Sequence, residues 1–170
     1  MRSIIIIWCL LHISFSSIFT QSREELRKEQ DSIYKSNITK TRLNGKYIPK
    51  DIEDAFKELD QLSPPKELMK VKLADENLIA KKLHFGLGRW MSYNWNFELG
   101  SRFSHYLTIN MNLIYTDDMI DFMLRVYHRY LNKKPLDAKN LGESYQKKRD
   151  DAYAAELKLK YGIDSIVKKK

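Results

Sequence analysis

The sequence predicts an all-α fold, a single compact domain of about five or six helices around a central helix rich in tryptophan and glycine. Three observations support this class. Apolar residues recur at intervals of three and four along several segments, which is the period of an amphipathic helix. No stretch of useful length alternates apolar and polar residues as a half-buried strand would. The sequence also contains no internal repeat and no heptad run.

The first 22 residues have the features of a signal peptide. Arg2 supplies a positive start, residues 4–19 are mostly apolar, and Thr20-Gln21-Ser22 is a small-x-small cleavage site. We therefore expect an exported chain, periplasmic or secreted, with an N-terminal membrane anchor as the alternative. The only cysteine, Cys9, lies in this segment, so the processed chain has no disulfide and no thiolate metal site.

The net charge of +8 is carried by the two flanks of the predicted domain. Residues 23–46, a charged spacer, contain seven basic and four acidic residues. Residues 133–170 contain eleven basic and six acidic residues. Residues 49–132 contain eleven basic and twelve acidic residues. A nucleic-acid-binding domain normally has a basic face on its ordered part, so we expect no nucleic-acid partner. The basic tail, Lys168–Lys170, suits a weak contact with an anionic membrane surface.

The helical domain is predicted over residues 47–134, after the turn-forming pair Asn44-Gly45. A first helix is expected from about Ile52, because Pro49 and several acidic residues suit a first helical turn. The apolar residues that follow it at helical spacing are Ile52, Ala55, Phe56 and Leu59. Residues 63–65, Ser-Pro-Pro, end this helix. Asp75 is then placed to cap the central helix.

Three further helices are expected after the central one. Ser101 is a natural cap for a short helix. Thr116 opens the clearest helix of the sequence, with two aspartates in its first turn, where the helix dipole favours anions. Its broad apolar stripe indicates that it is largely buried. A last helix runs from Asp137 to about Gly162, within a basic C-terminal helix and tail over residues 135–170.

The central helix has apolar residues on two faces. The first face is aliphatic and ends in Trp90, and the second contains Met91 and Trp95. A glycine inside a helix costs roughly 1 kcal/mol against alanine, yet Gly86 and Gly88 stand two residues apart here. We interpret these glycines as the place where a neighbouring element comes close, with a kink in the helix as the alternative.

Five spaced motifs occur in order in the predicted domain. They are YIPKDIEDAFKELD at Tyr47–Asp60, HFGLGRW at His84–Trp90, the pair Asn94-Trp95 followed by Gly100-Ser101-Arg102, DDM at Asp117–Met119, and YHRYLN at Tyr127–Asn132. In this order they resemble an uncharacterised domain family of Bacteroidetes-type bacteria. The resemblance covers roughly half of the chain. It implies a domain of unknown function with no established activity.

The sequence departs from that family at three places. Ser92-Tyr93 stand where the family has Arg-Asn, Glu98 replaces a tryptophan, and Tyr115-Thr116 replace His-Pro. A polar site that depended on the arginine or the histidine of the family is therefore not expected in this chain.

Aromatic and polar side chains gather between Arg89 and Arg102. Apolar walls with a few polar anchors are typical of ligand sites. Core packing explains most of the aromatic residues, but it explains less readily an asparagine beside a tryptophan and a Gly-Ser-Arg turn. We therefore predict a non-catalytic binding or interaction surface for a protein or a small polar ligand, formed by Arg89, Trp90, Asn94, Trp95, Ser101 and Arg102.

Two alternatives stay open at the level of the sequence. A hydrolase-type enzyme would use His84 or His128 as its base, although no nucleophile elbow, phosphate loop or zinc-binding histidine pair accompanies them. A purely structural domain would place every motif residue in the core or at a helix end. We expect no cofactor and no metal, because Asp117 and Asp118 point in different directions on a helix and lack an oxygen-rich loop.

Overall fold

The computed structural model describes residues 22–62 and 64–162. This part of the chain is mostly helical, and its strands are two residues long, so the predicted all-α class is confirmed. The predicted signal peptide lies outside the described residues except for Ser22. Within residues 22–62 and 64–162, no helix has both the length and the apolar composition needed to cross a membrane.

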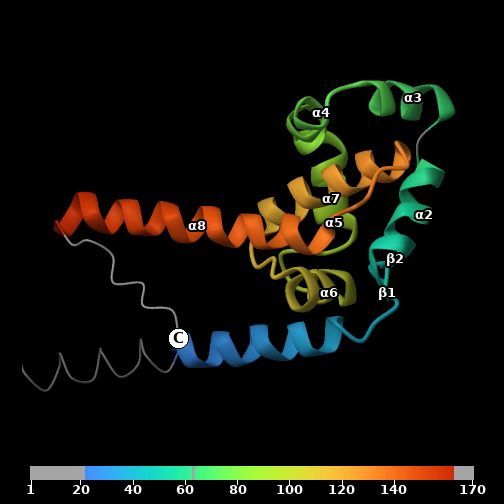
Figure 1. The fold of residues 1–170 in the computed structure, drawn as a ribbon. Coiled ribbons are helices and arrows are strands. Elements are labelled where there is room, and N and C mark those ends of the chain that lie inside the picture. Colours follow the sequence, from blue (N-terminus) through green and yellow to red (C-terminus); the bar gives the residue numbers. More distant parts are fainter. Residues whose placement is uncertain (1–21, 63, 163–170) are drawn as a thin grey trace, which may run out of the picture.

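Helix α7 runs through the middle of the body, with α2, α4 and α5 packed against it (Figure 1). A helix over residues 22–37 precedes the labelled elements and, like the far half of α8, projects from one side of the body. The elements are, in order, β1 (Arg42–Leu43), β2 (Lys46–Tyr47), α2 (Ile52–Leu62), α3 (Pro65–Leu73), α4 (Glu76–Leu83), the π-helix η1 (His84–Gly88, without a label in Figure 1), α5 (Arg89–Asn94), α6 (Arg102–Met111), α7 (Thr116–Leu131) and α8 (Ala138–Tyr161).

The spacer before the domain forms the helix over residues 22–37 and the β1–β2 hairpin. The hairpin turns at Asn44 and Gly45, which both have positive φ, 49° and 75°, as a tight hairpin turn requires. The Tyr34 hydroxyl is hydrogen-bonded to His105 Nδ1 at 2.8 Å. The Tyr34 ring lies so close to Gly100 that a Cβ there would be 2.2 Å from it. The end of the spacer helix is thereby fastened to the domain.

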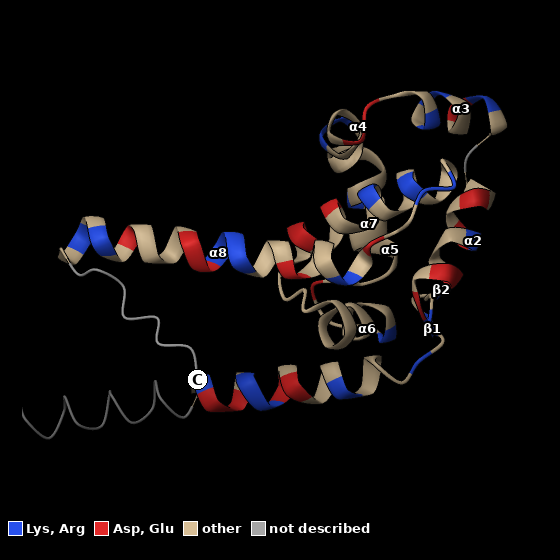
Figure 2. Ribbon diagram, viewed as in Figure 1, with Lys and Arg blue, Asp and Glu red and all other residues tan. Residues whose placement is uncertain are grey.

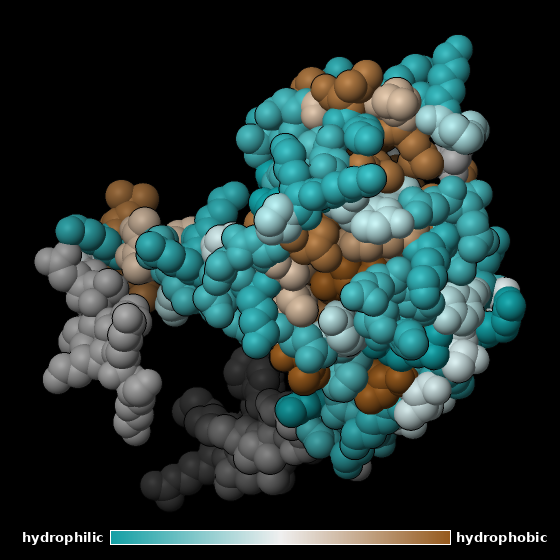
Figure 3. Space-filling model, turned by 45° about the vertical axis from the view of Figure 1, so that its right-hand side comes forward, coloured by the Kyte–Doolittle hydropathy of each residue, from teal (hydrophilic) through white to brown (hydrophobic). Residues whose placement is uncertain are grey.

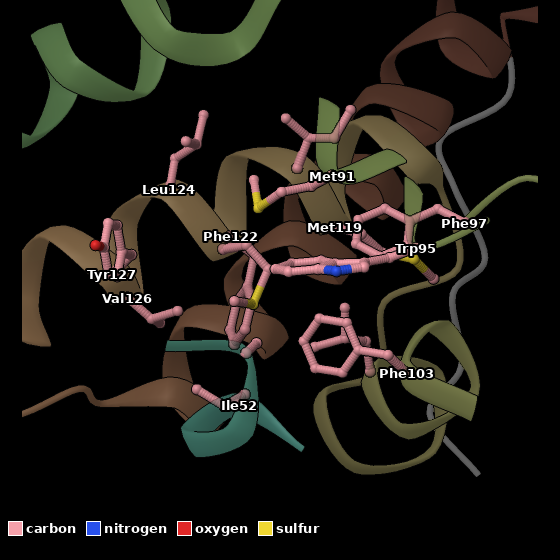
Figure 4. Close-up of a cluster of buried hydrophobic side chains, with 14 of the residues drawn as sticks. Ile52, Met91, Trp95, Phe97, Phe103, Met119, Phe122, Leu124, Val126 and Tyr127 are labelled. Atoms are coloured by element: carbon pink, nitrogen blue, oxygen red, sulfur yellow. The ribbon is translucent and has the colours of Figure 1, made fainter. Parts of the chain in front are cut away.

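Helix α7 and the tryptophan-rich segment form the core together. Half of the sixteen residues of α7 are buried, namely Met119, Ile120, Phe122, Met123, Leu124, Val126, Tyr127 and His128. Trp95 packs edge-on against Phe103, with 5.3 Å between the ring centroids, and lies among Met91 and Phe122 (Figure 4). The tryptophan-rich segment is therefore central, as predicted, but it shares that position with α7.

The predicted central helix is divided into α4, η1 and α5. The π-helix η1 contains both glycines, so a π-helical turn interrupts the α-helix at this place. A Cβ at Gly88 would lie 2.4 Å from Ile120 Cγ2 of α7, whereas a Cβ at Gly86 would meet nothing within 4 Å. Only Gly88 is thus required for the close approach of the two elements.

A group of ion pairs joins the start of α4 to α7. Asp75 caps α4 as predicted, since its side chain accepts from two backbone N–H groups of the first turn. Glu76 accepts hydrogen bonds from Arg129 Nε at 3.0 Å and Nη2 at 2.9 Å. Within α7, Arg125 Nε lies 2.7 Å from Asp121 Oδ2, and Arg125 Nη1 also lies 3.6 Å from Glu76.

Helix α8 is packed on the body by its first half only. A Cβ at Gly142 would lie 2.2 Å from the carbonyl oxygen of Met111, so α6 and α8 are in close contact there. Tyr145 donates a hydrogen bond to Asp121 of α7. Beyond residue 150 none of the described residues is buried, and charges of both signs follow one another (Figure 2). The helix ends at Gly162, with a φ of +63°, where the sequence predicted its end.

The contact at Gly88 predicts opposite outcomes for the two central glycines. Gly88→Ala is expected to lower the free energy of unfolding by about 1–3 kcal/mol, because Ile120 and its neighbours must move. Gly86→Ala is expected to leave it unchanged or to raise it by up to about 1 kcal/mol, because alanine is the better helix former. Urea unfolding followed by circular dichroism measures both, and equal effects would contradict the packing described.

The ion pairs of Glu76 with Arg125 and Arg129, here called the Glu76 cluster, predict a free energy of unfolding that depends on pH. Hydrogen bonds from Arg129 are the largest of the influences that lower the pKa of Glu76 below its usual 4.5. The ionised carboxylate of Glu76 therefore stabilises the fold fully at pH values above 4.5, and this contribution is lost as the pH falls through the lowered pKa. Glu76→Gln is expected to cost about 1–3 kcal/mol at pH 7, with a smaller gap to wild type at pH 3 in urea unfolding.

The matched control is Glu67→Gln on α3. Glu67 has an ion pair with Lys70 at 2.8 Å, and both side chains are more than half exposed. A pair of this kind contributes no more than about 0.5 kcal/mol. If Glu76→Gln changed stability as little as Glu67→Gln at pH 7, the role assigned to the Glu76 cluster would be wrong.

Candidate functional site

An open cleft of about 760 Å³ lies where η1, α5 and the loop after α5 meet the start of α7 and the turn of the hairpin. It is lined by Asn44, His84, Phe85, Arg89, Ser92, Tyr93, Asn96, Glu98, Leu99, Thr116, Asp117 and Ile120. The cleft draws on five segments of the chain, so its shape depends on the packing described above.

One side of the cleft is a row of large side chains on η1 and α5. Phe85, Arg89 and Tyr93 follow one another at spacings of four residues and point away from the core. The Arg89 guanidinium carbon lies 5.8 Å from the centroid of the Phe85 ring, within the range of a cation–π contact. The row thus presents a cation between two exposed aromatic rings.

Charges of both signs line the cleft. His84 Nε2 lies 3.6 Å from Asp117 Oδ1, and the Asp117 side chain is 82% exposed. Glu98, in the loop after α5, supplies a second carboxylate. Arg89 supplies the positive charge. The described residues contain no group of three histidine, cysteine or acidic side chains that could hold a metal ion.

The structure does not bring the predicted binding residues together on one surface. Of the six, Arg89 lines the cleft. Trp95 is 1% exposed in the core, and Trp90 packs edge-on against it with 5.8 Å between ring centroids. The Asn94 side-chain amide donates to the Trp90 carbonyl at 2.9 Å, which is a local contact one turn back along the helix.

Ser101 and Arg102 have their partners inside the fold. Ser101 is fully buried and caps α6, and it exchanges hydrogen bonds with Ser104 in a capping box. Arg102 donates through Nε, at 2.7 Å, and through Nη2 to the carbonyl oxygen of Ile48. Its guanidinium also lies over the Tyr47 ring, 5.1 Å from the centroid. Arg102 therefore holds the hairpin against α6.

The two candidate catalytic histidines differ in access to solvent. His128 is 3% exposed, and its Nε2 lies 2.9 Å from the carbonyl oxygen of Ala74, to which it donates. Its Nδ1 has no hydrogen-bond partner among the described residues and lies 3.9 Å from Glu76. His128 thus joins α7 to the segment before α4. Only His84 can meet a molecule in the cleft.

One known family matches the middle of the chain. Residues 48–131 match the family model of a domain of unknown function, DUF6794. The matched residues are just under half of the chain and include α2 to α7, hence every helix that lines the cleft. This match is consistent with the resemblance of the sequence motifs to an uncharacterised domain family. No curated protein and no solved structure matches the chain.

Several lining residues are not among the six predicted from the sequence, including Phe85, Tyr93, Glu98 and Leu99. Tyr93 is one of the aromatic side chains that the sequence gathers around Arg89, and Phe85 stands four residues before that arginine, so the sequence contained a signal for both. The loop residues gave no such signal, since their exposure depends on how the loop packs between α5 and α6.

The two arginines are expected to respond differently to substitution. Arg102→Ala should lower the free energy of unfolding by about 1.5–3 kcal/mol, the range for a hydrogen bond to a charged group. Arg89→Ala should change it by no more than about 0.5 kcal/mol, because the side chain is exposed. Urea unfolding of the two variants and wild type measures the difference. Similar losses for both variants would contradict the separate roles assigned here.

Proposed function

We propose that the chain is an exported, non-catalytic binding protein whose helical domain holds a short peptide segment of a partner protein in the cleft around Arg89. The proposal retains the binding function that the sequence predicts. The contact surface differs from the one expected, since it is formed by Phe85, Arg89 and Tyr93 together with the loop that contains Glu98 and Leu99. The signal-peptide features of the first 22 residues support export.

The observation that carries the proposal is the exposure of three large apolar side chains at one cleft. Phe85 is 75% exposed, Tyr93 is 85% exposed and Leu99 is 61% exposed. Single exposed apolar residues are ordinary on protein surfaces, whereas a cluster with a polar rim is typical of an interaction site. The core does not need these side chains, because Trp95 and its neighbours fill it without them.

The chemistry of the cleft suits a peptide. The Arg89 guanidinium can bind a carboxylate through two parallel hydrogen bonds. Glu98 and Asp117 can accept hydrogen bonds from amide or ammonium N–H groups, and the rings of Phe85 and Tyr93 offer flat apolar surface for a side chain. The volume of about 760 Å³ lies within the usual range for ligand sites.

One observation favours the hydrolase alternative. The carboxylate of Asp117 lies 3.6 Å from His84 Nε2 in the same cleft, and a histidine oriented by a carboxylate can act as a general base. In the part of the chain that the structure describes, no hydroxyl group is hydrogen-bonded to His84. A hydrolase would therefore have to activate a water molecule, and its substrate would have to occupy the proposed peptide site.

Selection of short random peptides from a phage-displayed library against the purified chain tests the proposal. Synthetic versions of the enriched peptides are titrated by isothermal calorimetry against wild type, Tyr93→Ala and Arg89→Ala. We expect each substitution to weaken binding about tenfold or more, as removal of a central aromatic or arginine contact does. The same affinity for Tyr93→Ala and wild type, or a failure to enrich any peptide, would refute the proposed site.

Tyr153→Ala is the matched control. Tyr153 is 64% exposed on the projecting half of α8 and lies outside the cleft, so its removal should leave peptide affinity unchanged. Mass spectrometry of the enriched peptides after incubation with the chain tests the alternative. Intact peptides support binding alone. Cleavage that is lost in His84→Ala would favour the hydrolase instead.

A further inference from the structure

A second groove, of about 340 Å³, lies between α3, α4 and α7 and has no lining residue in common with the cleft. Its walls are mostly apolar. They are formed by Leu68, Val71, Ala74, Leu78, Ile79, Leu83, Leu87 and Tyr127, with Glu67, Lys70 and Lys82 as the charged members. The Tyr127 hydroxyl is already used, because it donates to Asp60 at 2.9 Å.

Helix α3 covers this groove incompletely. None of its residues is buried, and Leu68 and Val71, which line the groove, are only half-buried. Apolar side chains gather around a hollow at the end of the molecule formed by α3 and α4 (Figure 3). Most of the stability of a short helix comes from the burial of its apolar face. An apolar occupant beneath α3 would supply the burial that this helix lacks.

The charged members of the lining are arranged to favour an anion. Glu67 is paired with Lys70 at 2.8 Å, so their charges balance. Lys82, in the last turn of α4, is exposed and has no carboxylate partner among the described residues. The groove therefore combines an apolar interior with an unbalanced positive charge at its edge. A ligand that matches it has an apolar body and one anionic end.

We propose that this groove binds a single fatty acid molecule, with the acyl chain along the apolar walls and the carboxylate at Lys82. The size of the groove sets the chain length. A methylene group takes up about as much space as a water molecule, about 30 Å³. The groove volume of about 340 Å³ therefore corresponds to on the order of ten such groups. A medium-length saturated chain such as decanoate is of about this size, whereas the two acyl chains of a phospholipid exceed it.

Isothermal calorimetry with sodium hexanoate, octanoate and decanoate, each below its micelle concentration, tests the size of the site. Burial of each added methylene should raise the affinity on the order of threefold. Affinity should stop rising for chains longer than the groove, as measured with tetradecanoate. The absence of decanoate binding, or an affinity independent of chain length, would overturn the proposal.

Two neighbouring lysines on α4 provide matched variants that test whether the carboxylate of the ligand lies at Lys82. Lys82→Met keeps the apolar stem of the side chain and removes the ammonium group, and we expect it to weaken decanoate binding about tenfold. Lys81→Met changes an exposed lysine that does not line the groove and should bind decanoate as wild type does. Binding of 1-decanol should be the same in all three proteins. Equal losses in the two variants would refute the position of the carboxylate.

A bilayer is the competing occupant. Co-sedimentation with phosphatidylglycerol vesicles separates the two cases, because a site for one fatty acid molecule does not require a membrane. Binding to these vesicles together with no calorimetric binding of decanoate would overturn the proposal in favour of a membrane contact. Leu78→Trp, at the edge of the groove, should reduce decanoate binding and leave the helical circular dichroism spectrum unchanged.

Discussion

The close approach of η1 to α7 is the constraint on which the rest of the structure depends. Gly88 leaves room for the Ile120 side chain of α7 against the η1 backbone, and Trp95, further along the same segment, lies in the core. The same geometry leaves Arg89 and Tyr93 on the outside, facing the first turn of α7 across the cleft. The core and the proposed binding surface are therefore two sides of one packing arrangement.

The features that could be predicted from the sequence are those decided by local chemistry. The cap at Asp75, the cap at Ser101, the start of α7 at Thr116 and the glycine at the end of α8 were all predicted at the positions where they occur. Each depends on hydrogen bonds or backbone angles within a few residues. The apolar period likewise indicated the burial of α7, because a wide stripe on a long helix must be covered.

The features that could not be predicted depend on contacts between distant segments. Arg102 and His128 each bind a backbone carbonyl 54 residues away, and no spacing rule identifies such a partner. The exposure of Phe85, Arg89 and Tyr93 could not be predicted for a different reason. A π-helical turn contains more residues than an α-helical turn, so faces assigned at 100° per residue lose their register beyond His84. The structure therefore changes which aromatic side chains reach solvent.

The contact between Tyr34 and Gly100 links the beginning of the chain to the cleft, since Gly100 directly follows Leu99 of its lining. The sixteen residues of the helix over 22–37 extend about 24 Å at the usual rise per residue. Because Tyr34 holds the end of this helix against the loop that lines the cleft, a movement of the helix relative to the domain would also move one wall of the cleft.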